Sequence, residues 1–325
     1  MGRLENGLDG SVTLTGSLGL TFIPDDGADA ETLLRHADQA MYQAKQGGRG
    51  NYCVFDAGIE RKLQTCRQVL QDFERALAAG ELKLYYEPKI HLRTGEVIGA
   101  EVLLRWQHPQ RGLLQPDEFL SKIENSELIC ELGEWLIVSA CEQLQAWELQ
   151  GLDFSLSINI AAHHLRRPDF SARVAVLLDS FPGLRREHLE FEIVETGALS
   201  DLDGVALTMQ RCCDSGVRFA LDDFGTGYSS LTYLRRLPVA TIKIDRSFVL
   251  DILHNASDRE LVRSIIGLAR SLGRSVIAEG IETPAHRRAL LDLGCELGQG
   301  YGIAKPMPSE TFSAWAEDWL TTLAR

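Results

Sequence analysis

From Glu81 to the end of the chain, short apolar runs alternate with amphipathic stretches, and this alternation strongly constrains the fold. Eight runs predict strands, at 83–91, 96–106, 153–161, 188–195, 218–223, 240–245, 275–281 and 296–302. Helical patterns lie between most of them, near 116–127, 131–149, 169–180, 203–215, 246–254, 258–272, 284–293 and 309–320. Strands that alternate with helices form parallel sheets, and eight such units are typical of a (β/α)8 barrel.

The first two predicted strands are joined only by Arg93-Thr94-Gly95, which suits the turn of a β-hairpin. A hairpin makes these two strands antiparallel, whereas most later strands follow a helix and are expected to run parallel to their neighbours. The sequence therefore predicts an α/β protein, a modified (β/α)8 TIM-like barrel with an antiparallel first strand.

The residues before the barrel predict a smaller α/β piece. Ser11–Ile23 and Asn51–Phe55 are strand-like, and a helical pattern begins at Asp29 and ends at Gly47-Gly48. Ile59–Leu77 predicts one long helix with apolar residues at alternating spacings of four and three. That spacing suits a short coiled coil or an amphipathic connector packed on the next domain, and the connector is favoured. The predicted parts are an α/β fragment at 1–56, a linker helix at 57–80 and the barrel at 81–325.

The charge and cysteine content limit the partners and the compartment. The chain has 33 Lys and Arg against 46 Asp and Glu, a formal net charge of −13, which argues against a broad face for duplex nucleic acid. Its 7 cysteines are scattered without a CxxC pair, as expected for free thiols in a reducing cytosol. The sequence has no leader pattern and no apolar run long enough for a bilayer. We therefore expect a cytoplasmic chain without membrane contact, although a longer parent protein could carry an anchor upstream.

Polar side chains accompany seven successive predicted strands, at or near the ends of their apolar runs. Active sites of (β/α)8 barrels lie at the carboxyl ends of the strands, where such side chains would meet. A single acidic residue after a strand is more often a helix cap or a loop residue, but seven in succession are hard to explain in that way. Carboxylates and an amide without histidine suit Mg²⁺ or Mn²⁺ rather than zinc. The residues are Glu101, Arg105, Asn159, Glu192, Glu195, Asp222, Asp223, Lys243, Glu279, Glu282 and Gln299.

Two of these positions allow more than one interpretation. Asp222 and Asp223 point to opposite faces in a regular strand, but at a strand end both can approach one site and a shared carboxylate can bridge two cations. Asp223 could instead cap the following helix. Lys243 could be a counter-ion for buried acids or could orient an attacking water, and the sequence leaves both open. The segment 224–230 predicts a mobile loop at the barrel mouth, which Glu195 could hold through backbone N–H groups.

Seven motifs in this region resemble those of a known family. They are Glu101-Val102-Leu103-Leu104-Arg105-Trp106, Asn159, Glu192-Ile193-Val194-Glu195, Asp222-Asp223-Phe224-Gly225-Thr226-Gly227, Lys243-Ile244-Asp245, Glu279-Gly280-Ile281-Glu282-Thr283 and Gln299-Gly300-Tyr301. Over residues 80–322 the chain resembles the EAL-domain cyclic di-GMP phosphodiesterases. The resemblance implies a metal-dependent hydrolase that opens one phosphodiester bond of cyclic di-GMP to give linear pGpG. It also implies two Mg²⁺ or Mn²⁺ ions per active site, inhibition by Ca²⁺, and a homodimer.

The resemblance further implies a role for each matching residue. The implied metal ligands are Glu101, Asn159, Glu192, Asp222, Asp223 and Glu279. The implied catalytic residues are Glu101, Asp222, Glu279 and Lys243, with Lys243 at the attacking water. The implied substrate contacts are Glu87, Leu104, Arg105, Glu282 and Gln299, with Arg105 at a phosphate. The implied loop residues are Glu195, Gly225, Thr226 and Gly227.

The sequence departs from the family pattern at two positions. Val102 stands where the family has Ala, and we expect only a packing change because that side chain should point away from the metals. Glu87 stands where most relatives have Gln, and its charge could weaken substrate binding, shift the metal preference or be neutralised by a raised pKa. The alternative function is therefore a catalytically weak or inactive EAL domain that acts as a cyclic di-GMP receptor. A structural module with ordinary acidic caps is a third possibility, disfavoured by the seven strand ends.

The N-terminal piece resembles the last third of a GGDEF domain, the domain that makes cyclic di-GMP. The matching segments are Gly16-Ser17-Leu18-Gly19-Leu20, Ala37-Asp38-Gln39-Ala40-Met41-Tyr42-Gln43-Ala44-Lys45 and Gly48-Arg49-Gly50-Asn51. The glycine-rich catalytic signature of that family lies further upstream and is absent here. We therefore expect 1–56 to be a C-terminal fragment of a GGDEF domain that does not synthesise the messenger, within a longer GGDEF–EAL protein.

Overall fold

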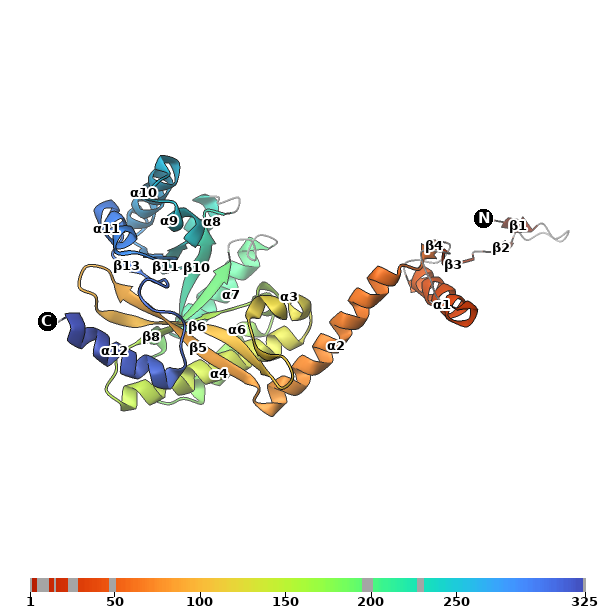
Figure 1. Cartoon of the computed structure of the whole chain (residues 1–325), viewed down its shortest axis with the longest axis horizontal. Helices are drawn as coiled ribbons and strands as arrows, with labels where there is room; N and C mark the ends of the chain where they lie inside the picture. The colour runs from red at the N-terminus through yellow and green to blue at the C-terminus, as the bar shows by residue number, and fades with distance from the viewer. Residues whose placement is uncertain are drawn as a thin grey trace. The chain divides into compact units, whose positions relative to one another are not determined.

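A computed structural model of the chain describes residues 2–4, 12–14, 16–22, 29–46, 51–194, 201–226 and 231–323. The chain divides into two compact units, Met1–Asp72 and Phe73–Arg325, and each is described by itself (Figure 1). The division falls within a long helix, α2 (Ala57–Ala79). No helix among these residues has the length and apolar character needed to cross a membrane.

The first unit is a small α/β arrangement. Strands β1 (Gly2–Leu4) and β2 (Val12–Leu14) are antiparallel, and β3 (Leu18–Leu20) runs parallel to β4 (Tyr52–Val54). Helix α1 (Ala30–Gln46) connects β3 to β4. It begins where the Thr32 amide donates to Asp29 Oδ1 at 2.8 Å, and it packs so closely on β3 that a Cβ on Gly19 would lie 1.9 Å from the Ala37 carbonyl oxygen. The predicted strand–helix–strand order is confirmed, but the segment predicted as one strand at Ser11–Ile23 contains two short strands, β2 and β3, with different partners.

The second unit contains a closed barrel of eight strands surrounded by helices (Figure 1). The first strand of the barrel, β5 (Leu82–His91), is antiparallel to both of its neighbours, β6 (Val97–His108) and β13 (Leu297–Gly298). The other neighbouring barrel strands pair in parallel. The short β7 (Gly112–Leu114) pairs with β6 outside the barrel. The barrel strands are β5 (Leu82–His91), β6 (Val97–His108), β8 (Ser155–Asn159), β9 (Leu189–Val194), β10 (Arg218–Phe224), β11 (Thr241–Ile244), β12 (Ser275–Ala278) and β13 (Leu297–Gly298). The predicted fold class and its antiparallel first strand are confirmed.

The helices around the barrel have identifiable local causes. Helix α11 (Pro284–Leu293) begins where the Thr283 hydroxyl accepts from the His286 amide, with Pro284 in its first turn, and ends at Gly294 with φ of 87°. The helices are η1 (Pro116–Glu118), α3 (Leu120–Ile123), α4 (Leu128–Leu149), α5 (Ala162–Leu165), α6 (Phe170–Asp179), η2 (Arg186–His188), α7 (Leu202–Asp214), α8 (Leu231–Arg236), α9 (Arg246–Leu250), α10 (Ala256–Ser271), α11 (Pro284–Leu293) and α12 (Ser309–Leu323).

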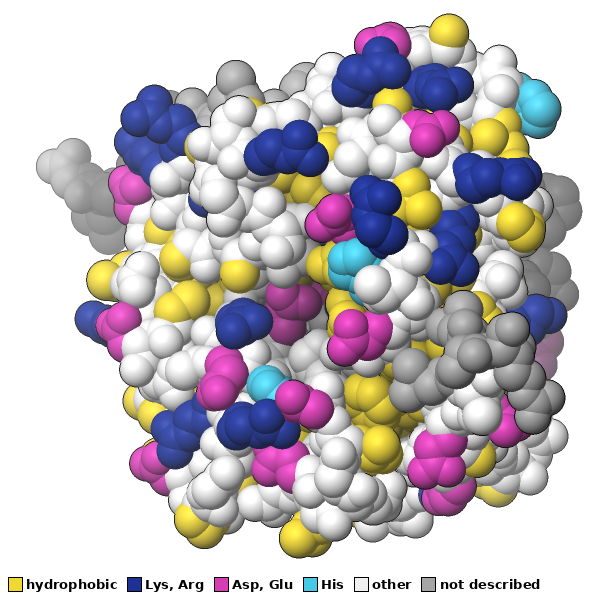
Figure 2. Space-filling view, turned by 90° about the vertical axis from the view of Figure 1, so that its left-hand side faces the viewer, with side chains coloured by type: hydrophobic (Ala, Val, Ile, Leu, Met, Phe, Trp, Pro, Cys, Tyr) yellow, Lys and Arg dark blue, Asp and Glu magenta, His cyan; other side chains and the backbone are white. Residues whose placement is uncertain are grey.

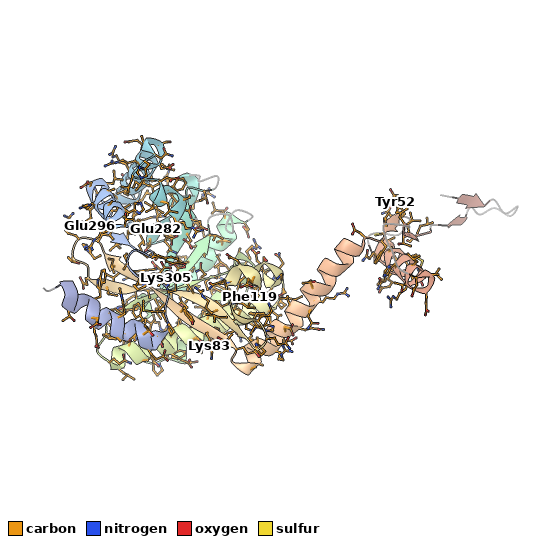
Figure 3. All side chains as sticks on the ribbon, in the orientation of Figure 1. Tyr52, Lys83, Phe119, Glu282, Glu296 and Lys305 are labelled. Carbon is orange, nitrogen blue, oxygen red and sulfur yellow. The ribbon has the colours of Figure 1, made fainter. Side chains whose placement is uncertain are left out.

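Large aromatic side chains form much of the packing outside the strands. Trp147 of α4 stacks on Phe312 of α12 at 4.9 Å between ring centroids, and both contact Phe154, which directly precedes β8. In a second aromatic cluster, Phe73 of α2 packs on Trp106 of β6 and on Phe119 (labelled in Figure 3), with 5.5 Å between ring centroids in each pair. These buried rings fix the helices on the barrel.

Some predicted boundaries were wrong. The predicted continuous helix at 116–127 is a 3-10 turn followed by one short helix, because Phe119 leaves helical geometry with φ of −135°. The last two strands end at Ala278 and Gly298, earlier than predicted, and the chain continues through Gly280 and Gly300 at positive φ.

The surface has mixed charge on the face in Figure 2, where Lys and Arg side chains are interspersed with Asp and Glu.

Candidate metal and phosphodiester site

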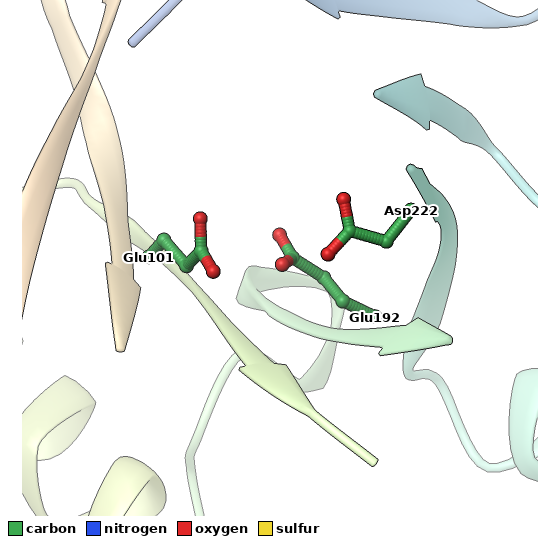
Figure 4. Close-up of side chains that lie close together, drawn as sticks. All are labelled: Glu101, Glu192 and Asp222. Atoms are coloured by element: carbon green, nitrogen blue, oxygen red, sulfur yellow. The ribbon is translucent and has the colours of Figure 1, made fainter. Parts of the chain in front are cut away.

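Three carboxylates from separate strands meet inside the barrel. Glu101 of β6, Glu192 of β9 and Asp222 of β10 each offer one oxygen, and these oxygens lie within 4.8 Å of one another (Figure 4). All three side chains are buried. Since strands β8 and β9 pair Asn159 with Glu192, the amide of Asn159 lies at the same level, and its Nδ2 donates to Glu101 Oε1 at 3.1 Å.

A second carboxylate group shares Asp222 with the first. Oxygens of Asp222, Asp223 and Glu279 also lie within 4.8 Å of one another. Asp223 is a non-glycine residue with φ of 53°, and the register of β10 against β11 shifts between Leu221 and Phe224. This left-handed backbone breaks the alternation of the strand, which explains how two adjacent aspartates serve one site.

Lys243 of β11 lies at the centre of both groups. Its Nζ is 3.1 Å from Glu101 Oε2 and 2.6 Å from Glu192 Oε2. It is also 3.1 Å from Asp222 Oδ1 and 2.7 Å from Glu279 Oε1. Burial acts against the charge of Lys243, but Glu101, Glu192 and the two other acids together outweigh it and raise the pKa of the lysine well above its usual range. The lysine is therefore charged and is a counter-ion for four acids.

One lysine does not compensate all of these acids. Burial raises the pKa of Asp222 to about 7, and Glu192 and Glu101 add to the shift. Burial likewise raises the pKa of Glu279 well above its usual range, with Asp222 adding to the effect. Glu192 differs, because Lys243 and Lys89 overcome the effect of burial and lower its pKa to about 2. Carboxylates held together in this way fit divalent cations that prefer oxygen ligands, such as Mg²⁺ or Mn²⁺.

Residues expected to meet the substrate surround this centre. Gln299 Nε2 donates to Glu101 Oε2 at 2.6 Å, and the buried Oε1 of Gln299 has no hydrogen-bond partner within the described part of the chain. Arg105 donates to the Leu104 carbonyl at 2.8 Å and lies over the ring of Tyr85, 5.4 Å from its centroid. Its other guanidinium donors suit a phosphate oxygen.

Glu87 and Glu282 differ in their relation to the centre. Glu87 of β5 is buried and pairs across the hairpin with Glu101. Burial, with Glu101 as the next cause, raises the pKa of Glu87 to about 7. Glu282 is exposed, and its amide donates to His286 Nδ1 at 3.3 Å (Glu282 is labelled in Figure 3). Within the described residues, no carboxylate group that could hold a metal includes Glu282.

The loop after β10 is described only at its start. Gly225 has φ of 105°, and a Cβ there would lie 2.9 Å from Phe248. The Thr226 hydroxyl donates to the Asp223 carbonyl at 2.9 Å, which closes a turn directly after the two aspartates. Gly227 and Glu195, to which loop roles were assigned, lie outside the described residues.

Sequence reasoning missed a second group of polar residues deeper in the barrel. Lys89, Ser157, Glu190 and Thr241 contact one another there. A signal was present, because Ser157, Glu190 and Thr241 each lie two residues before a predicted site residue and therefore on the same strand face.

Comparisons with known proteins support the resemblance. The family model "EAL domain" matches residues 70–306, and "Diguanylate cyclase, GGDEF domain" matches residues 6–51. The bifunctional diguanylate cyclase/cyclic di-GMP phosphodiesterase MucR of Pseudomonas aeruginosa is 39% identical over 93% of this chain and 44% of its own length. The cyclic di-GMP phosphodiesterase PdeR of Escherichia coli is 38% identical over 94% of this chain and 46% of its own length.

A solved structure extends this similarity to three dimensions. The structure described as "PaMucR Phosphodiesterase, c-di-GMP complex" is 39% identical, with a TM-score of 0.72 over 75% of this chain and 99% of that chain. The chain thus matches nearly all of that domain, whereas it spans less than half the length of the two curated relatives.

Proposed function

The chain belongs to the EAL-domain family, and from this premise we propose that it hydrolyses one phosphodiester bond of cyclic di-GMP to give linear pGpG. The observation that carries the proposal is the pair of carboxylate groups that share Asp222. Relatives described as cyclic di-GMP phosphodiesterases, and a similar structure in complex with that nucleotide, support the choice of substrate.

We propose two divalent cations, Mg²⁺ or Mn²⁺, as the cofactors. Glu101, Asn159, Glu192 and Asp222 would hold one, and Asp222, Asp223 and Glu279 would hold the other. When bound, such a pair makes water a better nucleophile and neutralises charge on the phosphate oxygens. Inhibition by Ca²⁺ is part of the same proposal, because Ca²⁺ prefers longer bonds and a less regular geometry than Mg²⁺.

The other side chains of the site bind and orient. The Lys243 ammonium keeps four carboxylates together, and we assign to its Nζ the further role of orienting the attacking water. Arg105 would hold a phosphate oxygen, and the Leu104 backbone, whose carbonyl accepts from Arg105, fixes the direction of that guanidinium. Gln299 and Glu282 would contact the substrate nearby, and Gly225, Thr226, Gly227 and Glu195 would shape the adjoining loop.

Glu87 bears on whether the enzyme is fully active. Burial raises the pKa of the Glu87 carboxyl to about 7, and in its protonated form this carboxyl can donate a hydrogen bond as a glutamine amide does. This favours activity over a loss of function at this position. The ionised form would place a negative charge near an anionic substrate, which is the observation that favours the second candidate, a cyclic di-GMP receptor with weak or no turnover.

We also propose the division of the chain into a GGDEF fragment at 1–56, a linker helix at 57–80 and the phosphodiesterase domain at 81–325. Two observations support this organisation: the similarity to a GGDEF domain over 6–51, and the division of the chain into two compact units after Asp72. The exact bounds of the three parts are part of the proposal. A homodimer stays a prediction from the sequence.

The first experiment incubates the purified chain with cyclic di-GMP and Mg²⁺ or Mn²⁺ at mildly alkaline pH and resolves the products by anion-exchange chromatography. We expect pGpG from the wild type and none from Asp222→Asn, because Asp222 belongs to both carboxylate groups. Binding of the nucleotide without turnover would favour the receptor and make Glu87→Gln the next variant. If the chain neither binds nor hydrolyses cyclic di-GMP, both candidate functions are contradicted.

A further inference from the structure

A second buried lysine lies next to the proposed metal site. Lys89 of β5 is one of the largest fully buried side chains, and its Nζ is 2.8 Å from Glu192 Oε1. The same Nζ donates to the Ser157 hydroxyl and lies 3.7 Å from Glu190 Oε2. A buried ammonium has a large desolvation cost, so its three polar neighbours indicate a defined role for its position.

These residues form a layer below the site. Ser157, Glu190 and Thr241 precede Asn159, Glu192 and Lys243 by two residues on β8, β9 and β11, and barrel interiors are built from such layers. On antiparallel β5 the order is reversed, so Lys89 lies one layer below Glu87.

Lys89 itself is held in place from the lower layer. The Ser157 hydroxyl donates to Glu190 Oε2 at 3.0 Å, and the Thr241 hydroxyl donates to Glu190 Oε1 at 2.6 Å. Both oxygens of Glu190 are therefore occupied by hydroxyl groups, and the direct hydrogen bond to Lys89 from this layer is that of Ser157, which remains when Glu190 loses its charge. The network joins four strands, so its geometry is set by the barrel rather than by a loop.

As a result, each carboxylate oxygen of Glu192 accepts a hydrogen bond from a different lysine. Its Oε1 accepts from Lys89 and its Oε2 accepts from Lys243, and its side chain is 0% exposed. Of these two lysines, Lys243 also contacts Glu101, Asp222 and Glu279 and would compete with a cation for these acids, whereas Lys89 would not. Lys89 contacts Glu192 alone among the carboxylates seen in Figure 4. It can keep its hold on Glu192 while the other oxygen faces Glu101 and Asp222.

We propose that Lys89 is a positioning residue for metal binding, which holds the Glu192 carboxylate by Oε1 so that Oε2 stays directed at the shared site. The inference rests on the proposed function for the identity of the metal site. A competing interpretation makes Lys89 only the counter-ion of Glu190. The distances favour Glu192, at 2.8 Å against 3.7 Å, and Glu190 already accepts two hydroxyl hydrogen bonds.

The test is a titration of the whole chain with Mn²⁺ alone. Binding is measured by calorimetry or by electron paramagnetic resonance of the free ion. Lys89→Met keeps an unbranched side chain only one atom shorter and removes the ammonium. We expect its Kd for Mn²⁺ to rise about 10- to 100-fold, as when other residues that orient metal ligands are removed. At saturating Mn²⁺ we expect the KM for cyclic di-GMP to stay within about threefold of the wild type. A purely structural role would lower the Tm and leave the Mn²⁺ affinity unchanged.

The matched control is Glu190→Gln, which removes the other charge that Lys89 meets and keeps the contact with Glu192. Its Kd for Mn²⁺ should stay within a few-fold of the wild type. If Lys89→Met alone does not fold, Lys89→Met combined with Glu190→Gln removes both charges and is compared with Glu190→Gln.

Unchanged or tighter Mn²⁺ binding by a folded Lys89→Met chain overturns the inference, and so does an equal loss of affinity in Glu190→Gln. The outcome is separate from that of the proposed function. A wild type that binds Mn²⁺ but releases no pGpG contradicts the phosphodiesterase, while the Mn²⁺ affinities still decide the role of Lys89.

Discussion

Replacing Asp223 by asparagine should stabilise the metal-free chain and remove much of its response to Mn²⁺. Asparagine tolerates the left-handed backbone of Asp223, with φ of 53°, so the substitution chiefly changes the charge. Oxygens of Asp223, Asp222 and Glu279 lie within 4.8 Å, and burial and Asp245 raise the pKa of Asp223. Two unit charges about 4.8 Å apart repel by about 3.5 kcal/mol at an effective dielectric constant of about 20.

Most of this repulsion is offset by Lys243, which lies 3.1 Å from Asp222 and 2.7 Å from Glu279. We therefore expect the variant to gain about 1 kcal/mol in the free energy of unfolding, which is about 2–4 °C in Tm for a domain of this size. Mn²⁺ at about one hundred times its Kd should stabilise the wild type by about 2.7 kcal/mol. The variant should gain much less, because one carboxylate group has lost a charged ligand.

The two Tm values should therefore change order when Mn²⁺ is added, and differential scanning calorimetry with EDTA or with Mn²⁺ measures this. Asp251→Asn is the matched control, because Asp251 is exposed at the end of α9, belongs to neither carboxylate group and undergoes the same chemical change. It should follow the wild type under both conditions. The reasoning is refuted if Asp223→Asn melts below the wild type in EDTA, or if Mn²⁺ raises both Tm values equally.

Three further predictions concern the barrel and its helices. Phe312→Ala should lower the free energy of unfolding by about 3–5 kcal/mol in urea titrations, because the ring is fully buried. Gly99→Ala should cost about 1–3 kcal/mol, since its Cβ would lie 2.1 Å from the Ser155 carbonyl oxygen. Gly267→Ala is its control, because the added Cβ meets nothing within 4 Å on helix α10, and it should gain about 1 kcal/mol. Burial lowers the pKa of His164 to about 4 from 6.5, so the unfolded chain binds a proton that the folded chain does not as the pH falls from 6.5 towards 4. Stability should fall by about 2 kcal/mol between about pH 7 and pH 5 on this account, and His164→Phe should remove that part of the slope in urea titrations at each pH.

The barrel could be predicted because its signal is repeated. Each strand is a short apolar run covered on both faces, so eight runs and the helices between them indicate one architecture even where single boundaries are wrong. Boundaries that depend on one residue were less predictable. The bend at Phe119 that divides the expected helix at 116–127 has no signal in helical periodicity, because the residues on both sides keep helical spacing.

The site could be predicted as a set of residues but not as a geometry. Glu101, Glu192 and Asp222 were expected to meet, and their oxygens do lie within 4.8 Å. That Asp223 joins Asp222 and Glu279 depends on its own left-handed backbone, which the sequence allows for any aspartate but does not require. The contacts of Lys243 with four acids likewise follow from the closure of the barrel.

The lower layer shows why reading strand ends alone is insufficient. On parallel strands the chain rises towards the site, so a residue two positions before Glu192 lies below it. On antiparallel β5 the chain descends, so Lys89 follows Glu87 in sequence and yet lies deeper in the barrel. A search confined to the residue that follows each apolar run finds Glu192 and leaves out Glu190 and Lys89, which contacts both acids. The reversed β5 therefore does more than close the barrel. It places the buried carboxyl of Glu87 at the level of the site and, two residues later, the buried ammonium of Lys89 against Glu192 and, in the layer below, Glu190.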